Sequence, residues 1–186
     1  MAHWFVIAAE SAAERSGCIL DLAERLRVHD IAVGGFTQTI GADDRERPCQ
    51  QLTRLGSGER LLLATAGVVP RQAHDEAFCD YVFAGDAFDR AGQWLRADAL
   101  KCRVLTIDAV SKLEAQGRGH AASVRWALAL DGQHAVLLGV RSRVLFEVVE
   151  HFGLDRQPLT AFEAPLDEPK RQRLAAALFA LLRGTH

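Results

Sequence analysis

Arg15 and Ser16 occupy the first position along the chain where residue types and spacing suggest chemistry. They follow a short apolar run at His3–Ala9, which is typical of a buried strand. In open parallel sheets, ligands bind beyond the carboxyl ends of the strands, where helix N-termini attract anions. A guanidinium and a hydroxyl at this position are candidates for binding an anion.

The stretch 9–16 (AESAAERS) departs from the phosphate-binding pattern G-x-x-x-x-G-K-[ST]. Ala9 and Glu14 stand at the glycine positions, Arg15 replaces the lysine, and only Ser16 is retained. Ser11 and Glu14 have the spacing of a capping box, which would close the helix N-terminus with its own side chains. Two interpretations stay open: this structural cap, or an anion bound by Arg15 and Ser16 through a rearranged loop.

Asp108 ends a second apolar run, at 104–108. It is a candidate ligand for a metal ion through water, or an ordinary carboxylate at a strand end. Lys112 and Glu114 follow in a glycine-bearing segment that we expect to be a loop, either facing a ligand or forming a solvated pair. Gly117 and Gly119 are expected to shape that turn.

Arg141 follows a third apolar run, at 135–140, and is a candidate ligand-binding residue or an ordinary arginine at a helix entry. His120 is expected to cap a helix or to lie at the surface. The seven histidines show no metal-binding spacing, and no G-x-S-x-G motif is present. We therefore predict no catalytic residue.

Alternating strands and helices must position these residues. Strands are expected at 3–9, 31–39, 104–108, 135–140 and 158–165, and helices are expected after most of them. This alternation predicts an α/β domain whose mostly parallel sheet is covered by helices on both faces. We expect a small β-hairpin insertion at about 50–66 and an exposed charged loop at 41–48. The pattern at 67–80 is too weak to predict a helix or a strand.

A final helix is expected at about 168–183, with Asp167 as its N-cap. Its buried stripe would consist of Leu174, Leu178, Leu181 and Leu182. The whole chain, 1–186, is expected to form one domain, since no linker or repeat interrupts it.

Composition excludes several classes of function. Hydrophobic residues make up 49% of the chain, and the formal charge is −2 with no basic stripe, so binding to nucleic acid is not expected. No apolar run reaches the ~20 residues that span a bilayer. Four well-separated cysteines suggest reduced thiols and a cytoplasmic location.

The segment 108–119 (DAVSKLEAQGRG) resembles the D-E-[IV]-G-x-[LM]-E segment of THEP-type P-loop nucleoside triphosphatases. It is closer to a related uncharacterised bacterial family with an F-G-K-x-E-A-x-G-x-G segment, in which the phosphate loop is commonly missing. The matching positions are Lys112, Glu114, Ala115, Gly117 and Gly119. Weaker matches at 34–36, 55–58 and 81–88 follow in the same order, so the resemblance covers about 5–152.

This resemblance implies a three-layer P-loop NTPase-like fold with a degenerate Walker A segment. In the active enzymes the strand-end carboxylate assists magnesium and the next residue, a glutamate, orients water. Asp108 matches the first, but Ala109 replaces the second. Because phosphoryl transfer depends on positioning and charge stabilisation, these losses argue against hydrolysis.

The first functional hypothesis is a non-hydrolysing protein that binds a nucleotide, with or without magnesium, or another oxyanion. The family resemblance adds an accessory role in molybdate handling. The alternative is a protein-interaction domain without a small ligand, and a residual nucleoside triphosphatase ranks third. Partners are therefore a small anionic ligand or a protein, and the sequence does not specify the oligomeric state.

Overall fold

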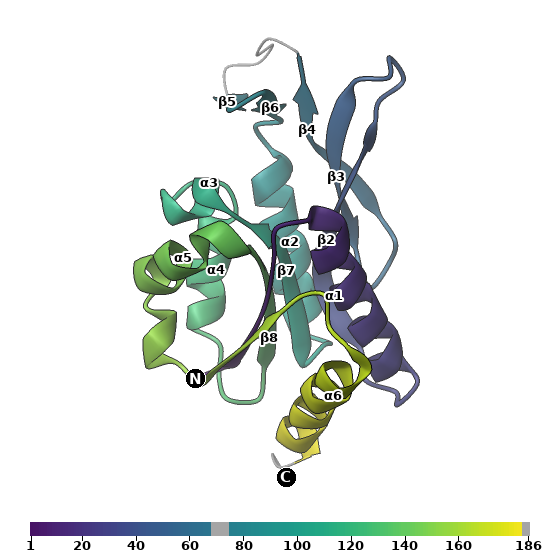
Figure 1. Cartoon of the computed structure of the whole chain (residues 1–186), viewed down its shortest axis with the longest axis vertical. Coiled ribbons are helices and arrows are strands. Elements are labelled where there is room, and N and C mark those ends of the chain that lie inside the picture. Colours follow the sequence, from purple (N-terminus) through teal and green to yellow (C-terminus); the bar gives the residue numbers. More distant parts are fainter. Residues whose placement is uncertain (68–74, 184–186) are drawn as a thin grey trace.

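A central sheet with helices on both faces forms the body of the computed structural model, which describes residues 1–67 and 75–183 (Figure 1). The described strands make one nine-stranded sheet in the order β5-β6-β4-β3-β2-β7-β8-β1-β9. Its strands are β1 His3–Ala9, β2 Val33–Ala42, β3 Pro48–Arg54, β4 Arg60–Ala66, β5 Glu76–Phe78, β6 Tyr81–Phe83, β7 Val104–Val110, β8 Ala135–Arg141 and β9 Leu159–Glu163.

The strands β2, β7, β8, β1 and β9 run parallel to one another, whereas β3 to β6 add antiparallel pairs beyond β2. The helices are α1 Ala12–Arg27, α2 Ala87–Ala99, α3 Lys112–Ala115, α4 Ala121–Leu128, α5 Leu145–Phe152 and α6 Glu168–Arg183. Short 3-10 turns lie at Ser142–Val144 and Leu154–Arg156. A mostly parallel core with an antiparallel extension is therefore confirmed.

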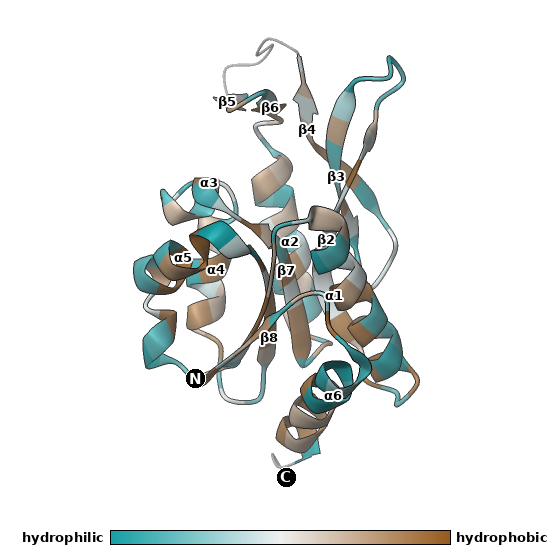
Figure 2. Ribbon diagram, in the orientation of Figure 1, coloured by the Kyte–Doolittle hydropathy of each residue, from teal (hydrophilic) through white to brown (hydrophobic). Residues whose placement is uncertain are grey.

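Two apolar layers hold the helices to the sheet. Residues of α1 and α6 pack on one face, and residues of α2, α4 and α5 pack on the other (Figure 1). The central strands β1, β7 and β8 are covered on both sides and are apolar along most of their length (Figure 2). This burial explains the uninterrupted apolar runs in the sequence at β1, β7 and β8.

The hairpin β3–β4 lies where the sequence indicates it, with its turn at Gly56 to Gly58. The expected loop at 41–48 is shorter than predicted, because β2 continues to Ala42 and β3 begins at Pro48. The antiparallel pairing of β2 with β3 extends as far as Ala42 and Pro48, so the charged residues 43–47 form a short turn rather than a long loop. Part of the unassigned stretch 67–80 forms β5, and 68–74 lies outside the described residues.

Helix α6 covers α1 and the adjoining face of the sheet. Asp167 caps it, since its side chain accepts a hydrogen bond from the Lys170 N–H at 2.9 Å. Leu174, Leu178 and Leu182 are buried, whereas Leu181 is only partly so. Within the described residues, no helix is long and apolar enough to cross a bilayer.

Leu178→Ala tests the packing of α6. Leu178 is fully buried, so losing its side chain should lower the free energy of unfolding by about 2–5 kcal/mol in a urea titration. Leu100→Ala is the control, because Leu100 is 86% exposed at the end of α2 and should change stability by less than about 0.5 kcal/mol. Equal effects of the two substitutions would show that α6 is not docked as described.

Candidate functional site

The carboxylate of Asp108 lies near the carboxyl end of β7 and is fully buried. Its Oδ1 accepts a hydrogen bond from Arg15 Nε at 2.6 Å, which is also an ion pair. Its Oδ2 accepts from the Ser16 hydroxyl at 2.6 Å and from the Gln38 backbone N–H at 3.0 Å. Asp108 thereby joins β7 to α1 and to β2.

Arg15 and Ser16 are brought to Asp108 by the early start of α1. The helix begins at Ala12, with only two residues between it and the end of β1. It therefore occupies the stretch where a phosphate-wrapping loop would lie. Ser11 caps it by accepting the Glu14 N–H at 3.4 Å. The second bond of a capping box, from the Ser11 backbone N–H to the Glu14 carboxylate, is absent among the described residues. Only half of the expected capping box therefore forms here.

Gly139 on β8 leaves the room that this ion pair needs. A Cβ atom added at Gly139 would lie 2.5 Å from Asp108 Oδ1 and 3.0 Å from the Arg15 Cδ. Both neighbours are buried and fixed by their hydrogen bonds, so neither can move away cheaply. Only glycine fits between them.

The residues around Asp108 do not fit a divalent cation. Both carboxylate oxygens already have donors, and the Arg15 guanidinium would repel a second cation at this distance. No group of three or more His, Cys, Asp or Glu side chains in the described ranges could hold a metal ion. The expected role of Asp108 as a metal ligand therefore stays a prediction that requires Arg15 to move.

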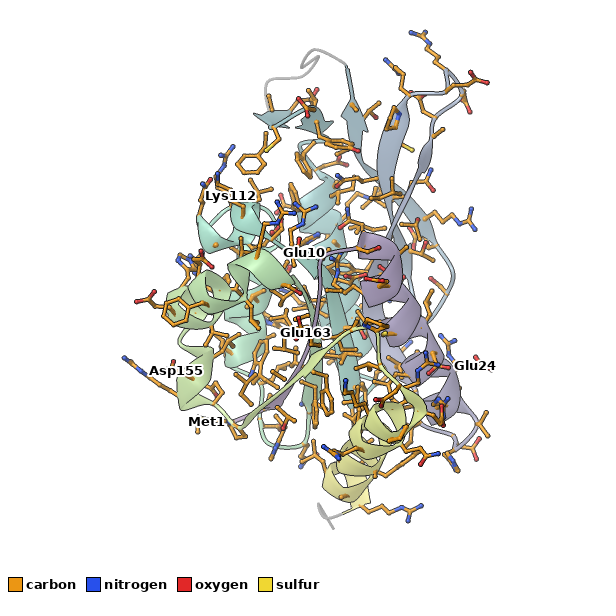
Figure 3. The ribbon with its side chains drawn as sticks, in the orientation of Figure 1. Met1, Glu10, Glu24, Lys112, Asp155 and Glu163 are labelled. Atoms are coloured by element: carbon orange, nitrogen blue, oxygen red, sulfur yellow. The ribbon has the colours of Figure 1, made fainter. Side chains whose placement is uncertain are left out.

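A cavity of about 190 Å³ lies beside this ion pair, near the carboxyl ends of β2, β7 and β8. Its polar lining includes Arg15, Gln38, Gln50, Tyr81, Ser111, Glu114, His120 and Arg141. Three of the six residues proposed from the sequence line this cavity: Arg15, Glu114 and Arg141. Asp108 is not in the wall but is bonded to Arg15, and Ser16 is bonded to Asp108. Lys112 is absent from the cavity wall and is exposed on α3 (Figure 3).

Arg141 and Arg143 differ in how they are held. Arg143 forms an exposed ion pair through Nε at 3.0 Å and Nη2 at 2.8 Å. Its partner is Glu10, which lies just after β1 (Figure 3). This hydrogen bonding lowers the pKa of Glu10. Arg141 lines the cavity, and its side chain makes no hydrogen bond within the described part of the chain. Of the two arginines, Arg141 is the one available to a ligand.

Glu114 corrects the expectation of a solvated loop pair with Lys112. Residues Lys112–Ala115 form a short helix, and Glu114 is only 2% exposed. Its oxygens accept the backbone N–H groups of Ser111 at 2.8 Å and His120 at 3.0 Å. Burial raises the pKa of Glu114 to about 7, and these two hydrogen bonds limit the rise.

His120 stands at the N-cap position of α4, as the sequence suggests, but it is not a surface residue and its side chain does not cap the helix. It is 1% exposed, and both ring nitrogens lack a hydrogen-bond partner among the described residues. The ring packs against Phe36 and Phe88, with centroids at 4.7 Å and 4.8 Å. Burial lowers the pKa of His120 to about 3, so the imidazole is neutral at pH 7.

Sequence reasoning missed Gln38 and Gln50 as wall residues. Gln38 Nε2 donates to Gln50 Oε1 at 2.7 Å, across the paired strands β2 and β3. Two glutamines on neighbouring strands are a weak signal in the sequence, because only the register of the two strands brings their side chains into contact. The sequence indicates the position of Glu114 more clearly than that of the two glutamines. Ser111 and Glu114 have the same S-x-x-E capping-box spacing as Ser11 and Glu14.

Two solved structures have the same architecture. The solution structure of a human cancer-related nucleoside triphosphatase matches with a TM-score of 0.69 and 20% identity, covering 100% of both chains. The crystal structure of THEP1 from the hyperthermophile Aquifex aeolicus matches with a TM-score of 0.58 and 16% identity, covering 98% of this chain and 99% of that one. At these identities the likeness shows a P-loop NTPase-like fold, as expected from the sequence. No protein-family model and no curated protein sequence matches the chain.

Arg15→Ala tests the buried ion pair. It would leave the Asp108 carboxylate buried without its cation, so the free energy of unfolding should fall by about 3–5 kcal/mol in a urea titration. The matched control is Arg143→Ala, which removes an exposed ion pair and should cost far less. A loss in Arg15→Ala no larger than that of the control would contradict the described pairing.

Glu114→Gln tests the buried carboxyl through the pH dependence of stability. The folded pKa of about 7 lies above the ordinary 4.5, so the wild-type protein should lose stability as pH rises through this range. The variant lacks this loss and should gain roughly 3 kcal/mol relative to wild type between pH 4.5 and 7.5. Urea unfolding at each pH measures the difference.

His120 contributes an opposite slope over part of that range, because its lowered folded pKa makes stability rise as pH increases from about 3 to 6.5. Wild type and Glu114→Gln both retain His120, so its contribution cancels in the comparison. A pH-independent difference between them would show that the Glu114 carboxyl titrates normally.

Proposed function

We propose that this chain binds a small anionic ligand, a nucleotide or another oxyanion, and does not hydrolyse it. The observation that carries the proposal is the convergence of Arg15 and Arg141 on one cavity near the carboxyl ends of the parallel strands. In sheets of this kind, that edge is where ligands bind. The fold shared with two nucleoside triphosphatases agrees with such a site.

The Arg15 guanidinium retains donors for an anion. It has five N–H groups, of which the pairing with Asp108 uses the one on Nε. Arg15 also lines the cavity, and its other four N–H groups are not used by the hydrogen bond to Asp108. Arg141 adds a second guanidinium from the neighbouring strand β8, and two such groups suit the oxygens of a phosphate or a similar anion.

Three features argue against hydrolysis. The first turn of α1 takes the place of a phosphate-wrapping loop. The Asp108 carboxylate is bonded to Arg15 and Ser16 rather than being free to assist a metal ion. Ala109 follows it and has no group that could orient water. Phosphoryl transfer would need all of these parts in place.

Nucleotides and inorganic oxyanions both fit this chemistry. A tetrahedral anion such as molybdate requires only the two guanidinium groups, and the family resemblance at 108–119 favours an accessory role in molybdate handling. A nucleotide would also use the rest of the wall. The alternative, a protein-interaction domain, is favoured by the Ser11 cap, which takes up one backbone N–H that an anion would use.

A thermal-shift series tests binding. We expect a selective rise in melting temperature with one of ATP, GTP, phosphate, sulfate, molybdate or tungstate. A free ligand concentration of 100 times the dissociation constant should raise the free energy of unfolding by about 2.7 kcal/mol. Arg141→Ala should abolish the shift without unfolding the protein, because Arg141 is exposed. No release of phosphate from ATP or GTP is expected.

Arg143→Ala is the matched control, since Arg143 lies two residues away, outside the cavity wall, and should leave the shift intact. An equal loss in both variants would indicate general electrostatic attraction rather than a site. A flat response to every anion would overturn the proposal and favour the interaction domain.

A further inference from the structure

One part of the cavity wall is aromatic. It is formed by residues of β5, β6 and the start of α2: Phe78, Tyr81, Phe83 and Phe88. The rings of Phe83 and Phe88 stack with centroids 5.4 Å apart and an interplanar angle of 27°. A wall of this kind favours a flat ring system, because ring faces can pack on one another. An inorganic oxyanion gains nothing from it.

The two glutamines offer a donor and an acceptor to the same cavity. The bond from Gln38 Nε2 to Gln50 Oε1 leaves Gln38 Oε1 and Gln50 Nε2 without a partner in the described part of the chain. If both amides were turned round, one oxygen and one amino group would still remain. This pair matches a molecule that carries an N–H beside a C=O, the lactam edge of many nitrogen heterocycles.

His120 is a second, independent indication of a polar ring-shaped ligand. It lines the cavity, it is 1% exposed, and its two ring nitrogens have no partner among the described residues. Buried polar groups almost always have a hydrogen-bond partner, so an exception needs an explanation. A neutral imidazole supplies one donor and one acceptor, which a heterocycle with both functions could satisfy.

We infer that the cavity binds a flat, uncharged nitrogen heterocycle with a lactam edge, such as a nucleobase, between the aromatic wall and the Gln38–Gln50 pair. This inference rests on the proposed function for the cavity and makes the nucleotide, rather than an inorganic oxyanion, its ligand. The heterocycle would use the glutamines and the aromatic wall, and the anionic group would use Arg141 and Arg15.

The size of the cavity agrees with one ring system. Its volume of about 190 Å³ lies below the ~300–1,000 Å³ of pockets that enclose a drug-sized ligand. A whole nucleotide would not be enclosed, and its sugar and phosphates would extend past Arg141, which is exposed. The ring and the anionic group would then be bound by different side chains and can be tested separately.

Isothermal titration calorimetry with uncharged probes tests the ring site. The probes are inosine and 1-methylinosine, which differ only by a methyl group on the lactam nitrogen. We expect inosine to bind and the methylated probe to bind at least ~10-fold more weakly, because it leaves a buried acceptor unpaired. Gln50→Leu should weaken inosine by a similar factor, because it removes the donor to the lactam C=O and the partner that holds Gln38 in place.

Gln51→Leu is the matched control. Gln51 is the next residue on β3, is similarly half-buried and is absent from the cavity wall. It should leave inosine binding unchanged. If Gln51→Leu weakens inosine as much as Gln50→Leu does, the effect is one of hairpin stability and the inference fails.

The outcomes separate the two proposals. If nucleotides or oxyanions shift the melting temperature through Arg141 but inosine does not bind, the ring site is wrong and the anion site stands. Conversely, if inosine binds through Gln50 and no anion binds, the ring site stands and the anion site is wrong. Equal binding of inosine and 1-methylinosine would overturn the role of the glutamine pair.

Discussion

The ion pair between Arg15 and Asp108 is the interaction on which the rest of the site depends. A carboxylate that is wholly removed from water is stable only if cations and donors surround it, and Asp108 obtains these from α1 and β2. The requirement fixes the rotation of α1, because Arg15 and Ser16 must both face β7. It also fixes the position of β2, whose backbone donates at Gln38.

The same pair divides the ligand-binding edge of the sheet into two regions. On the side of α1 the space is filled by the first helical turn and by the guanidinium. Toward β2, β3 and α2 the space stays open as the cavity, and its wall combines cations, amides and aromatic rings. In this fold, Asp108, Arg15 and Ser16 are bonded to one another, and the remaining polar groups at this edge line the cavity.

The sequence predicted what depends on local pattern. The apolar run of β1 and the Asp167 cap both follow from spacing, and the fold was confirmed. It also placed Arg15 and Arg141 at the correct edge, because strand ends in a parallel sheet share one side. Partners far apart in the chain could not be predicted: Arg15 and Asp108 are 93 residues apart. The burial of His120 likewise depends on Phe36 and Phe88, which three separate elements bring together.

Gly139 allows this site to be identified in other sequences from a few residues, without relying on overall sequence similarity. Charge couples the cation at position 15 to the carboxylate at position 108. Sterics couple both of them to the glycine at position 139, since any Cβ there would displace the two side chains. Chains of this fold that pair an arginine at this place in the first helix with the strand-end carboxylate should therefore carry the glycine as well. The three residues form a signature that can be sought in other sequences, even where pairwise identity has fallen below the level at which alignments are informative.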